Sequence, residues 1–195
     1  MTTEKIVYLT RHGESEYNIL KKIGGNSKLT EKGLHYSKVL YEYFQSTDIE
    51  VYTSNLNRTC QTAQYFHETK AYPELNEINS GICDSKTYNE IKSSYPEEYK
   101  KRSKNKYYYR YPNGESYEDI KNRVAPIMEQ ILTSKKNNLI ICHQAVLRVL
   151  YSFFIETSEE KIPYLEIPLH TLFKFTITKE DNEIKNIEHD KYVLM

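Results

Sequence analysis

Several features that would point to a particular class of protein are missing from this 195-residue sequence. The three cysteines, Cys60, Cys83 and Cys142, have the spacing of neither a disulfide framework nor a zinc site. No apolar run approaches the length needed to span a membrane, and the N-terminus lacks the apolar core of a signal peptide. We therefore expect a soluble protein of the reducing cytoplasm that does not associate with membranes.

An excess of charge of one sign is also missing. Lys and Arg total 27, Asp and Glu total 27, and the formal net charge is zero. No overall field draws such a chain to nucleic acid, so we expect none as a partner. The sequence also has no phosphate-binding P-loop, no internal repeats and no carboxylate cluster suited to magnesium. A small-molecule substrate, bound without a metal or other cofactor, is the expectation.

Tyrosine, by contrast, is abundant, with 19 copies against 6 phenylalanines and no tryptophan. Many aromatic contacts must therefore carry a hydroxyl group that needs a hydrogen-bond partner. A chain of this length is expected to form one domain, residues 1–195, that buries about 70% of its unfolded surface.

Apolar strand patterns alternate with helical patterns along the chain, which is typical of an α/β fold. We predict strands at Ile6–Leu9, Glu50–Thr53, Tyr72–Leu75, Leu139–Cys142, Leu172–Ile177 and Glu183–His189. A helix capped by Thr30 should run to about Gln45, with Leu34, Leu40, Tyr43 and Phe44 as its buried stripe. Further helices should begin at Ser54 or Asn55 (to about His67), at a Ser116/Asp119 capping box, after His143 and after Ser158.

Two of the predicted strands end in a histidine. His12 follows Arg11 directly after the first strand, and His143 follows Leu139–Cys142. Because the carboxyl ends of parallel strands meet at one edge of a sheet, the two imidazoles can meet at one point. A single histidine at a strand end is more often a capped or solvated residue. The prediction of a catalytic site therefore depends on there being two such histidines.

Arginines surround this pair in the sequence. Arg11 adjoins His12, Arg58 falls in the first turn of a helix, and Arg148 lies one helical turn after Gln144. Guanidinium groups oppose protonation of a neighbouring imidazole and neutralise a bound phosphate. This combination is what transfer of a phosphoryl group to a nitrogen nucleophile requires. Arg58 facing outward would instead be an ordinary solvated residue.

A proton donor for the leaving group is the remaining requirement. Glu77 is the candidate, because it follows a predicted strand and lies between Leu75 and Ile78. A solvated loop carboxylate is the alternative, and spacing alone does not decide between the two.

Residues 87–111 form a polar, short-helical insert in which lysines and arginines alternate with tyrosines. Such interleaving can bind single-stranded nucleic acid, although the balanced charge argues against it. The segment can also be a solvated helical insert, or a lid that places cations over a phosphorylated small molecule. The earlier loop with Gly24 and Gly25 can likewise be a plain surface loop or a loop that covers a phosphate.

These motifs resemble the histidine phosphatase (phosphoglycerate mutase-like) superfamily. The stretches that carry the resemblance are Leu9–Ser15, Asn57–Thr59, Leu75–Ile78 and Cys142–Gln144. Within the superfamily, the chain is most similar, from about Ile6 to Lys174, to the phosphatase domain of the bifunctional 6-phosphofructo-2-kinase/fructose-2,6-bisphosphatases. This narrower similarity rests on Ile23–Gly25, Thr87–Tyr88, Tyr95–Glu98, Arg110–Pro112, Gly114–Asp119, Ile141–Val146 and Leu169–Thr171. The resemblance implies a three-layer sandwich whose mostly parallel central sheet is flanked by helices, with a helical lid insert at about 84–114.

The resemblance also implies a reaction, the hydrolysis of fructose 2,6-bisphosphate to fructose 6-phosphate and phosphate. His12 would be the nucleophile that becomes phosphohistidine, and Glu77 would protonate the leaving C2 oxygen and then help to activate water. The transferred 2-phosphate would be held by Arg11, Asn18, Arg58 and His143. The 6-phosphate and the sugar would be bound by Tyr88, Arg102, Lys106, Tyr117, Gln144 and Arg148, with Ile23 and Gly24 beside the sugar.

The sequence departs from this pattern at Asn26 and at Asn79-Ser80, where the family has aspartate and Asp-Ala. A kinase half is absent from the sequence, so the chain is either a stand-alone enzyme or part of a longer protein that includes a kinase domain. A homo-oligomer is compatible with either. The alternative functions are a phosphoglycerate mutase or a broad sugar-phosphate phosphatase, and, more remotely, an inactive interaction module.

Overall fold

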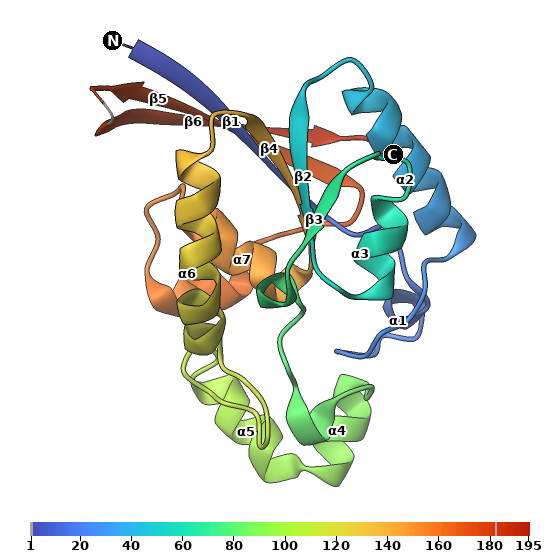
Figure 1. Ribbon diagram of the computed structural model, residues 1–195. Helices are drawn as coiled ribbons and strands as arrows, with labels where there is room; N and C mark the ends of the chain where they lie inside the picture. Colours follow the sequence, from blue (N-terminus) through green and yellow to red (C-terminus); the bar gives the residue numbers. More distant parts are fainter. Residues whose placement is uncertain (1, 182) are drawn as a thin grey trace.

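The computed structural model describes residues 2–181 and 183–195 and places six strands in one sheet, in the order β3-β2-β4-β1-β5-β6 (Figure 1). The strands are β1 (Thr2–Arg11), β2 (Ile49–Thr53), β3 (Thr69–Ala71), β4 (Asn137–Cys142), β5 (Thr171–Glu180) and β6 (Glu183–Val193). Strands β1 to β4 pair in parallel, whereas β5 runs antiparallel to both β1 and β6. The predicted, mostly parallel sheet is confirmed, and so is the late edge strand.

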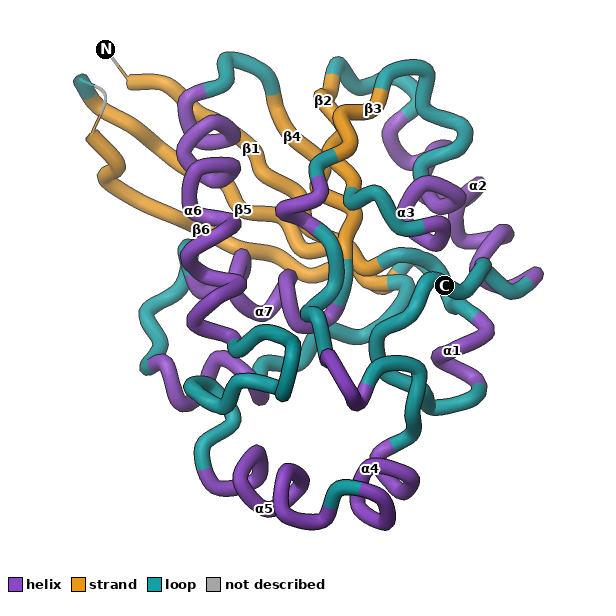
Figure 2. The backbone as a smooth tube through the Cα atoms, turned by 60° about the horizontal axis from the view of Figure 1, so that its bottom comes forward, coloured by secondary structure: helices purple, strands orange, loops and turns teal. Residues whose placement is uncertain are grey.

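Helices cover both faces of this sheet (Figures 1 and 2). The α-helices are α1 (Glu16–Ile19), α2 (Glu31–Phe44), α3 (Asn57–Thr62), α4 (Tyr88–Ser94), α5 (Pro96–Lys104), α6 (Tyr117–Thr133) and α7 (Gln144–Ser152). Short 3₁₀ helices lie at Pro73–Leu75, Gly81–Cys83 and Glu159–Tyr164. Within the described residues, no helix is both long and apolar enough to cross a membrane.

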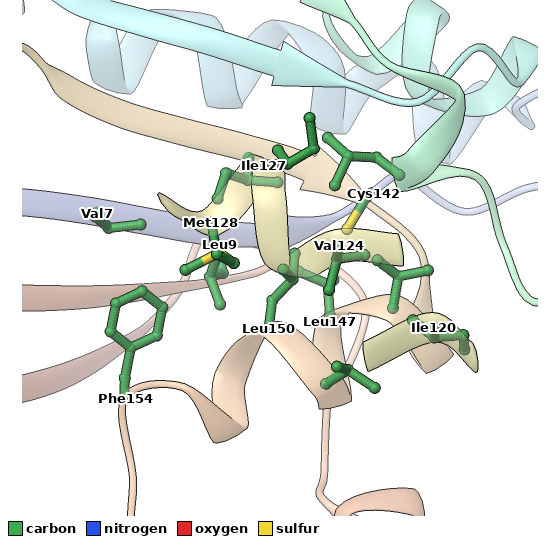
Figure 3. Close-up of a cluster of buried hydrophobic side chains, with 14 of the residues drawn as sticks. Val7, Leu9, Ile120, Val124, Ile127, Met128, Cys142, Leu147, Leu150 and Phe154 are labelled. Atoms are coloured by element: carbon green, nitrogen blue, oxygen red, sulfur yellow. The ribbon is translucent and has the colours of Figure 1, made fainter. Parts of the chain in front are cut away.

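Successive side chains of β1 point to opposite faces of the sheet, so that the strand contributes to a core on each face, between the sheet and a layer of helices. Val7 and Leu9 pack with α6 and α7 in the larger core, whereas Tyr8 packs with α2 in the smaller one. Figure 3 shows the larger core, in which Met128 of α6 lies beside Leu9 of β1. A strand buried on both faces must be apolar at consecutive positions, which is why its sequence reads as a continuous run.

Two predicted helix starts are confirmed by their caps. The side chain of Thr30 accepts a hydrogen bond from the Gly33 amide at the start of α2. At the start of α6, Ser116 and Asp119 form the reciprocal capping box. Both caps depend on groups only three residues apart, so the local sequence is sufficient to place them.

The buried stripe predicted for α2 is wrong at two positions. Leu34 and Tyr43 are 37% and 44% exposed, whereas Leu40 and Phe44 are buried as predicted. The helix turns Tyr36 inward instead, where its hydroxyl group hydrogen-bonds Thr10 of β1. That buried polar contact makes a tyrosine part of the core face.

Two further predicted elements differ from those in the structure. The segment Tyr72–Leu75 is not a strand: β3 ends at Ala71, and a 3₁₀ helix begins at Pro73, whose nitrogen cannot donate to a strand ladder. The third helix is also shorter than predicted. It covers only Asn57–Thr62. It begins after Leu56, since the Ser54 hydroxyl bonds His143 and the Leu56 amide and does not cap the helix.

The helices α4 and α5 lie beyond the carboxyl end of the parallel strands, away from the sheet (Figures 1 and 2). They have a small apolar cluster of their own, formed by Cys83, Ile91 and Tyr111 with the partly buried Tyr95 and Tyr99. The prediction of a helical insert at about 84–114 agrees with this arrangement.

Candidate active site

A pocket opens where the carboxyl ends of β1 and β4 meet. In the parallel register Arg11 lies opposite Cys142, so His12 and His143 leave the sheet side by side with ring centroids 5.2 Å apart. The pocket, about 680 Å³ including space open to solvent, is lined by Arg11, His12, Ser15, Tyr17, Asn18, Lys22, Ile23, Gly24, Arg58, Glu77, Ile78, Tyr88, Arg102, Tyr111, Tyr117, Gln144, Ala145 and Arg148. Five of these residues are cationic and one is a carboxylate, which makes the pocket a site for anions.

Hydrogen bonds determine the tautomer of His12. Its Nδ1 lies 2.7 Å from the carbonyl oxygen of Gly13. A carbonyl oxygen only accepts, so Nδ1 carries the proton. Nε2 therefore has the lone pair, and it accepts from Nε of Arg58 at 3.1 Å. The nitrogen with the free electron pair is the one that lies beside the arginine.

His12 is almost completely buried, with 3% of its surface exposed. This burial, followed by the charges of Arg58 and Arg11, holds its pKa well below 6.5. At neutral pH the imidazole is uncharged and is able to act as a nucleophile.

His143 is bonded to Arg58 and is also neutral. Its Nδ1 accepts from the same Arg58 Nε at 3.1 Å, and its Nε2 donates to the Ser54 hydroxyl at 2.7 Å. Ser54 in turn donates to Thr59 at 2.7 Å, whose hydroxyl donates to the Leu56 carbonyl at 2.8 Å. Burial and the charge of Arg58 hold the pKa of His143 well below 6.5. One arginine N–H is thus shared by two neutral imidazoles.

The two arginines nearest the histidines keep donors for a ligand. Arg58 uses Nη1 to bind the carbonyl oxygen of Gly25 at 2.8 Å. Arg11 uses Nη1 to bind the Ile167 carbonyl oxygen at 3.1 Å, and its buried Nε has no partner among the residues described. Burial lowers the pKa of Arg11 to about 10, so it stays charged at neutral pH. A buried, unpartnered N–H of a cation is costly unless an anion occupies the site.

Glu77 is held at the N-terminus of α7. Its Oε1 accepts from the amides of Ile78 at 3.0 Å and Ala145 at 3.2 Å. These bonds leave Oε2 for a proton transfer. Arg123 secures the loop before Glu77, because its guanidinium donates to the backbone carbonyl groups of Glu74 and Asn76.

The far end of the pocket is built from the insert and from α6 and α7. Arg102 of α5 donates to the Tyr88 hydroxyl at 3.0 Å, and its guanidinium lies 5.0 Å from the centre of that ring. Arg148 of α7 donates to the Tyr117 hydroxyl at 3.1 Å and to the Leu165 carbonyl at 2.8 Å. Burial opposes the charge of Arg102, but the surrounding tyrosines raise its pKa above the ordinary value. Two arginines held in place by tyrosines therefore form a second cationic group.

The sequence-predicted site residues line this pocket, with the exception of His143 and Lys106. His143 does not line the pocket itself, but it accepts a hydrogen bond from Arg58, which does. Lys106 donates to the Pro163 carbonyl at 2.9 Å, with its ammonium 4.6 Å from the centre of the Tyr164 ring. Burial, together with Arg102 and Arg148, lowers the pKa of Lys106 to about 7. Its assignment to the 6-phosphate stays a prediction.

Several lining residues were missed from sequence, namely Ser15, Tyr17, Lys22, Ile78, Tyr111 and Ala145. Tyr17, Lys22, Ile78 and Ala145 adjoin predicted site residues, a signal already present in the sequence. Among the described residues, no three or more His, Cys, Asp or Glu side chains are grouped so as to hold a metal ion.

Comparison with protein-family models gives a match to the histidine phosphatase superfamily (branch 1) over residues 7–190. A 6-phosphofructo-2-kinase/fructose-2,6-bisphosphatase of Aquarana catesbeiana is 46% identical over 178 residues, which are 89% of this chain. Isoform 1 of that enzyme from Homo sapiens is 45% identical over 181 residues, again 89% of this chain. In both cases the matched region is only 38% of the relative's own length.

Solved structures share the fold at lower sequence identity. The α-ribazole phosphatase of Shigella flexneri superposes with a TM-score of 0.81 at 21% identity, covering 92% of this chain and 93% of that one. Bacillus stearothermophilus YhfR superposes with a TM-score of 0.80 at 24% identity, with 93% and 94% covered. At these identities the likeness extends to the fold and not to the substrate.

Proposed function

The chain belongs to the histidine phosphatase superfamily, and we propose that it hydrolyses the 2-phosphate of fructose 2,6-bisphosphate through a phosphohistidine on His12. The observation that carries this proposal is the neutral His12, whose Nε2 lone pair faces Arg58 in an otherwise cationic pocket. The relatives that are 45–46% identical to the chain carry fructose-2,6-bisphosphatase in their names.

In the first step, Nε2 of His12 attacks phosphorus as the bond between phosphorus and the C2 oxygen breaks. The transferred phosphate takes the Arg58 Nε–H that bridges the two imidazoles in the structure described here, together with the free donors of Arg11. Asn18 contributes its amide nitrogen, since its amide oxygen accepts from the backbone and hydroxyl groups of Ser15. These donors stabilise charge on the equatorial oxygens of the transition state.

The leaving oxygen takes its proton from Glu77, which becomes a carboxylate. The covalent intermediate has phosphorus on Nε2 and the proton on Nδ1 of His12, where the Gly13 carbonyl stabilises the imidazolium. In the second step a water gives a proton to Glu77 and attacks phosphorus, which releases phosphate and restores neutral His12.

The second cationic group accounts for a substrate with two phosphates. Arg102 and Arg148 come from α5 and α7, line the same pocket as Arg11 and Arg58, and bind the hydroxyl groups of Tyr88 and Tyr117. Such a group can bind the second phosphate of a bisphosphorylated substrate. The finer assignments, with Gln144, Ile23 and Gly24 at the sugar and Lys106 at the second phosphate, are part of the proposal.

The test is a substrate panel applied to the wild type and to Arg102→Ala. The wild type should hydrolyse fructose 2,6-bisphosphate far faster than 2,3-bisphosphoglycerate or p-nitrophenyl phosphate, with fructose 6-phosphate as the product. Arg102→Ala removes a charge-assisted contact worth about 1.5–3 kcal/mol, so KM for the bisphosphate should rise about 10–100-fold. Turnover of p-nitrophenyl phosphate, which has no second phosphate, should change little.

Lys100→Ala is the matched control, because it removes the same charge from an exposed position of α5, where Lys100 pairs with Glu97. It should leave both substrates unaffected. Comparable turnover of all three substrates by the wild type would contradict the proposed specificity, and equal effects of the two variants would contradict the second phosphate site.

Glu77→Gln should lower kcat for fructose 2,6-bisphosphate by about 10²–10⁴-fold, the usual contribution of a general acid. The amide oxygen of glutamine can still accept from Ile78 and Ala145, so the loop keeps its geometry. With p-nitrophenyl phosphate, whose leaving group needs little protonation, the first step should stay fast and produce a burst of p-nitrophenol. An equal loss in the first step with both substrates would argue against Glu77 as the proton donor.

A further inference from the structure

His170 is a buried histidine that the proposed reaction does not use. It immediately precedes β5 and has a φ of 57°, in the left-handed region that residues other than glycine seldom adopt. Its ring packs against Tyr36, with centroids 4.8 Å apart, and its carbonyl oxygen accepts from the Leu194 amide. A strained backbone that persists in such a setting requires surroundings that hold it in place.

The imidazole of His170 contacts the loop that carries His12. Its Nε2 lies 3.3 Å from the backbone nitrogen of Glu14. The amide is the donor, so Nε2 must present its lone pair. Burial and the charge of Lys32 lower the pKa of His170, which agrees with a neutral ring.

One peptide group joins the two histidines. The carbonyl oxygen of Gly13, which accepts from His12 Nδ1, and the amide of Glu14, which donates to His170, belong to the same peptide bond. Since this bond is trans, its C=O and N–H point in opposite directions. His12 and His170 therefore lie at opposite edges of one peptide group, and a bond at the amide polarises the carbonyl.

The neighbouring backbone groups of this loop are already held. The Gly13 amide donates to the Thr62 hydroxyl at 2.9 Å, and the Glu14 carbonyl accepts from the Thr30 amide at 2.9 Å. A side chain on Gly33 would overlap the Glu14 carbonyl, so α2 also packs directly on the loop. The orientation of the central peptide then depends on the two imidazoles that bind it.

We propose that His170 is a positioning residue that fixes the Nδ1–H tautomer of His12 through the Gly13–Glu14 peptide. The accepting Nε2 of His170 keeps the Glu14 amide turned away from His12, which leaves the Gly13 carbonyl facing Nδ1. His12 then has its Nε2 lone pair directed toward the phosphate site. The catalytic consequence rests on the proposed function, whereas the tautomer does not.

The test compares His170→Leu, which removes the acceptor, with His170→Gln, which keeps one. ¹⁵N NMR of the histidine rings reads the tautomer of His12 without any substrate. We expect a single Nδ1–H form in the wild type and in His170→Gln, and a mixture of both tautomers in His170→Leu. In the same variant kcat should fall about 10–100-fold, as for other groups that orient a functional histidine, with KM little changed. His170→Gln should recover most of this loss.

His170→Gly serves where His170→Leu does not fold, because glycine adopts a positive φ without strain and also removes the acceptor. It should behave like His170→Leu. Unchanged His12 ring signals in a folded variant without the acceptor would overturn the proposal, as would an equal loss of kcat in His170→Leu and His170→Gln. If the wild type hydrolyses no phosphate ester, the proposed function fails, yet the ¹⁵N signals still decide the role of His170.

Discussion

His12→Ala should lower kcat for fructose 2,6-bisphosphate by about 10⁴–10⁶-fold, the range seen when the central nucleophile of a catalytic group is removed. Without Nε2 no covalent intermediate can form on residue 12, and the pocket retains only its cations and Glu77. The measurement is twofold: the rate of fructose 6-phosphate release, and the label that the protein retains after denaturation at alkaline pH, where phosphohistidine survives. Label from the 2-phosphate should remain on the wild type and be absent from His12→Ala.

The matched control is His35→Ala, since His35 is an exposed histidine on α2, outside the pocket. It should keep full activity and full labelling. Retention of label by His12→Ala would mean that another group, with His143 the nearest imidazole, is the nucleophile. Thermal melting of each variant separates loss of chemistry from loss of fold.

Arg58→Gln should have the next largest effect, a loss of about 10³–10⁵-fold in kcat, the range for an arginine that stabilises a transferring phosphoryl group. The same substitution removes a positive charge beside both imidazoles. In the wild type, burial first and the arginine charges second hold the pKa of His12 well below 6.5, so the nucleophile is neutral throughout the neutral range. Without Arg58 that pKa rises, although burial keeps it below the ordinary value.

The sign of the pH effect follows from this. Attack needs neutral His12, so the rate falls as the pH drops through the pKa of His12, and a higher pKa moves this fall to higher pH. The acidic limb of kcat/KM against pH, which reports the free enzyme, should therefore move upward in Arg58→Gln. Arg58→Lys keeps the charge but lacks the Nε–H shared by His12 and His143, so it should lose rate without moving that limb. An unmoved limb in Arg58→Gln would show that its charge does not keep His12 neutral.

Much of the fold could be predicted because its signals are local. A short run of apolar residues such as Leu139–Cys142 is typical of a strand that is buried on both faces, and a hydroxyl three residues before a free amide caps a helix, as at Thr30 and Ser116. The apolar runs likewise predict that His12 and His143 follow strand ends. The parallel pairing of β1 with β4 then brings the two histidines together.

Predictions failed where a distant contact competes with the local pattern. Ser54 is a plausible helix cap by sequence, but its hydroxyl binds His143, 89 residues away, and α3 begins later. The face of α2 is set by the hydrogen bond between Tyr36 and Thr10, which hydrophobic spacing does not reveal. The remaining failure, Tyr72–Leu75, has a local cause, since Pro73 has no N–H with which to extend the ladder beside β2.

Most of the strands and longer helices, the two strand-end histidines and the cationic side chains of the insert could thus be recognised from the sequence, because neighbouring residues suffice to specify these. Only the tertiary structure decided which nitrogen of His12 carries the proton, that one N–H of Arg58 serves both imidazoles, and that Arg123 secures the loop of Glu77. It also turned Lys106 toward Pro163 and away from the pocket lining. A hydrogen bond requires its donor and acceptor to be placed to within a few tenths of an ångström, and no local pattern sets that distance between groups far apart in the chain.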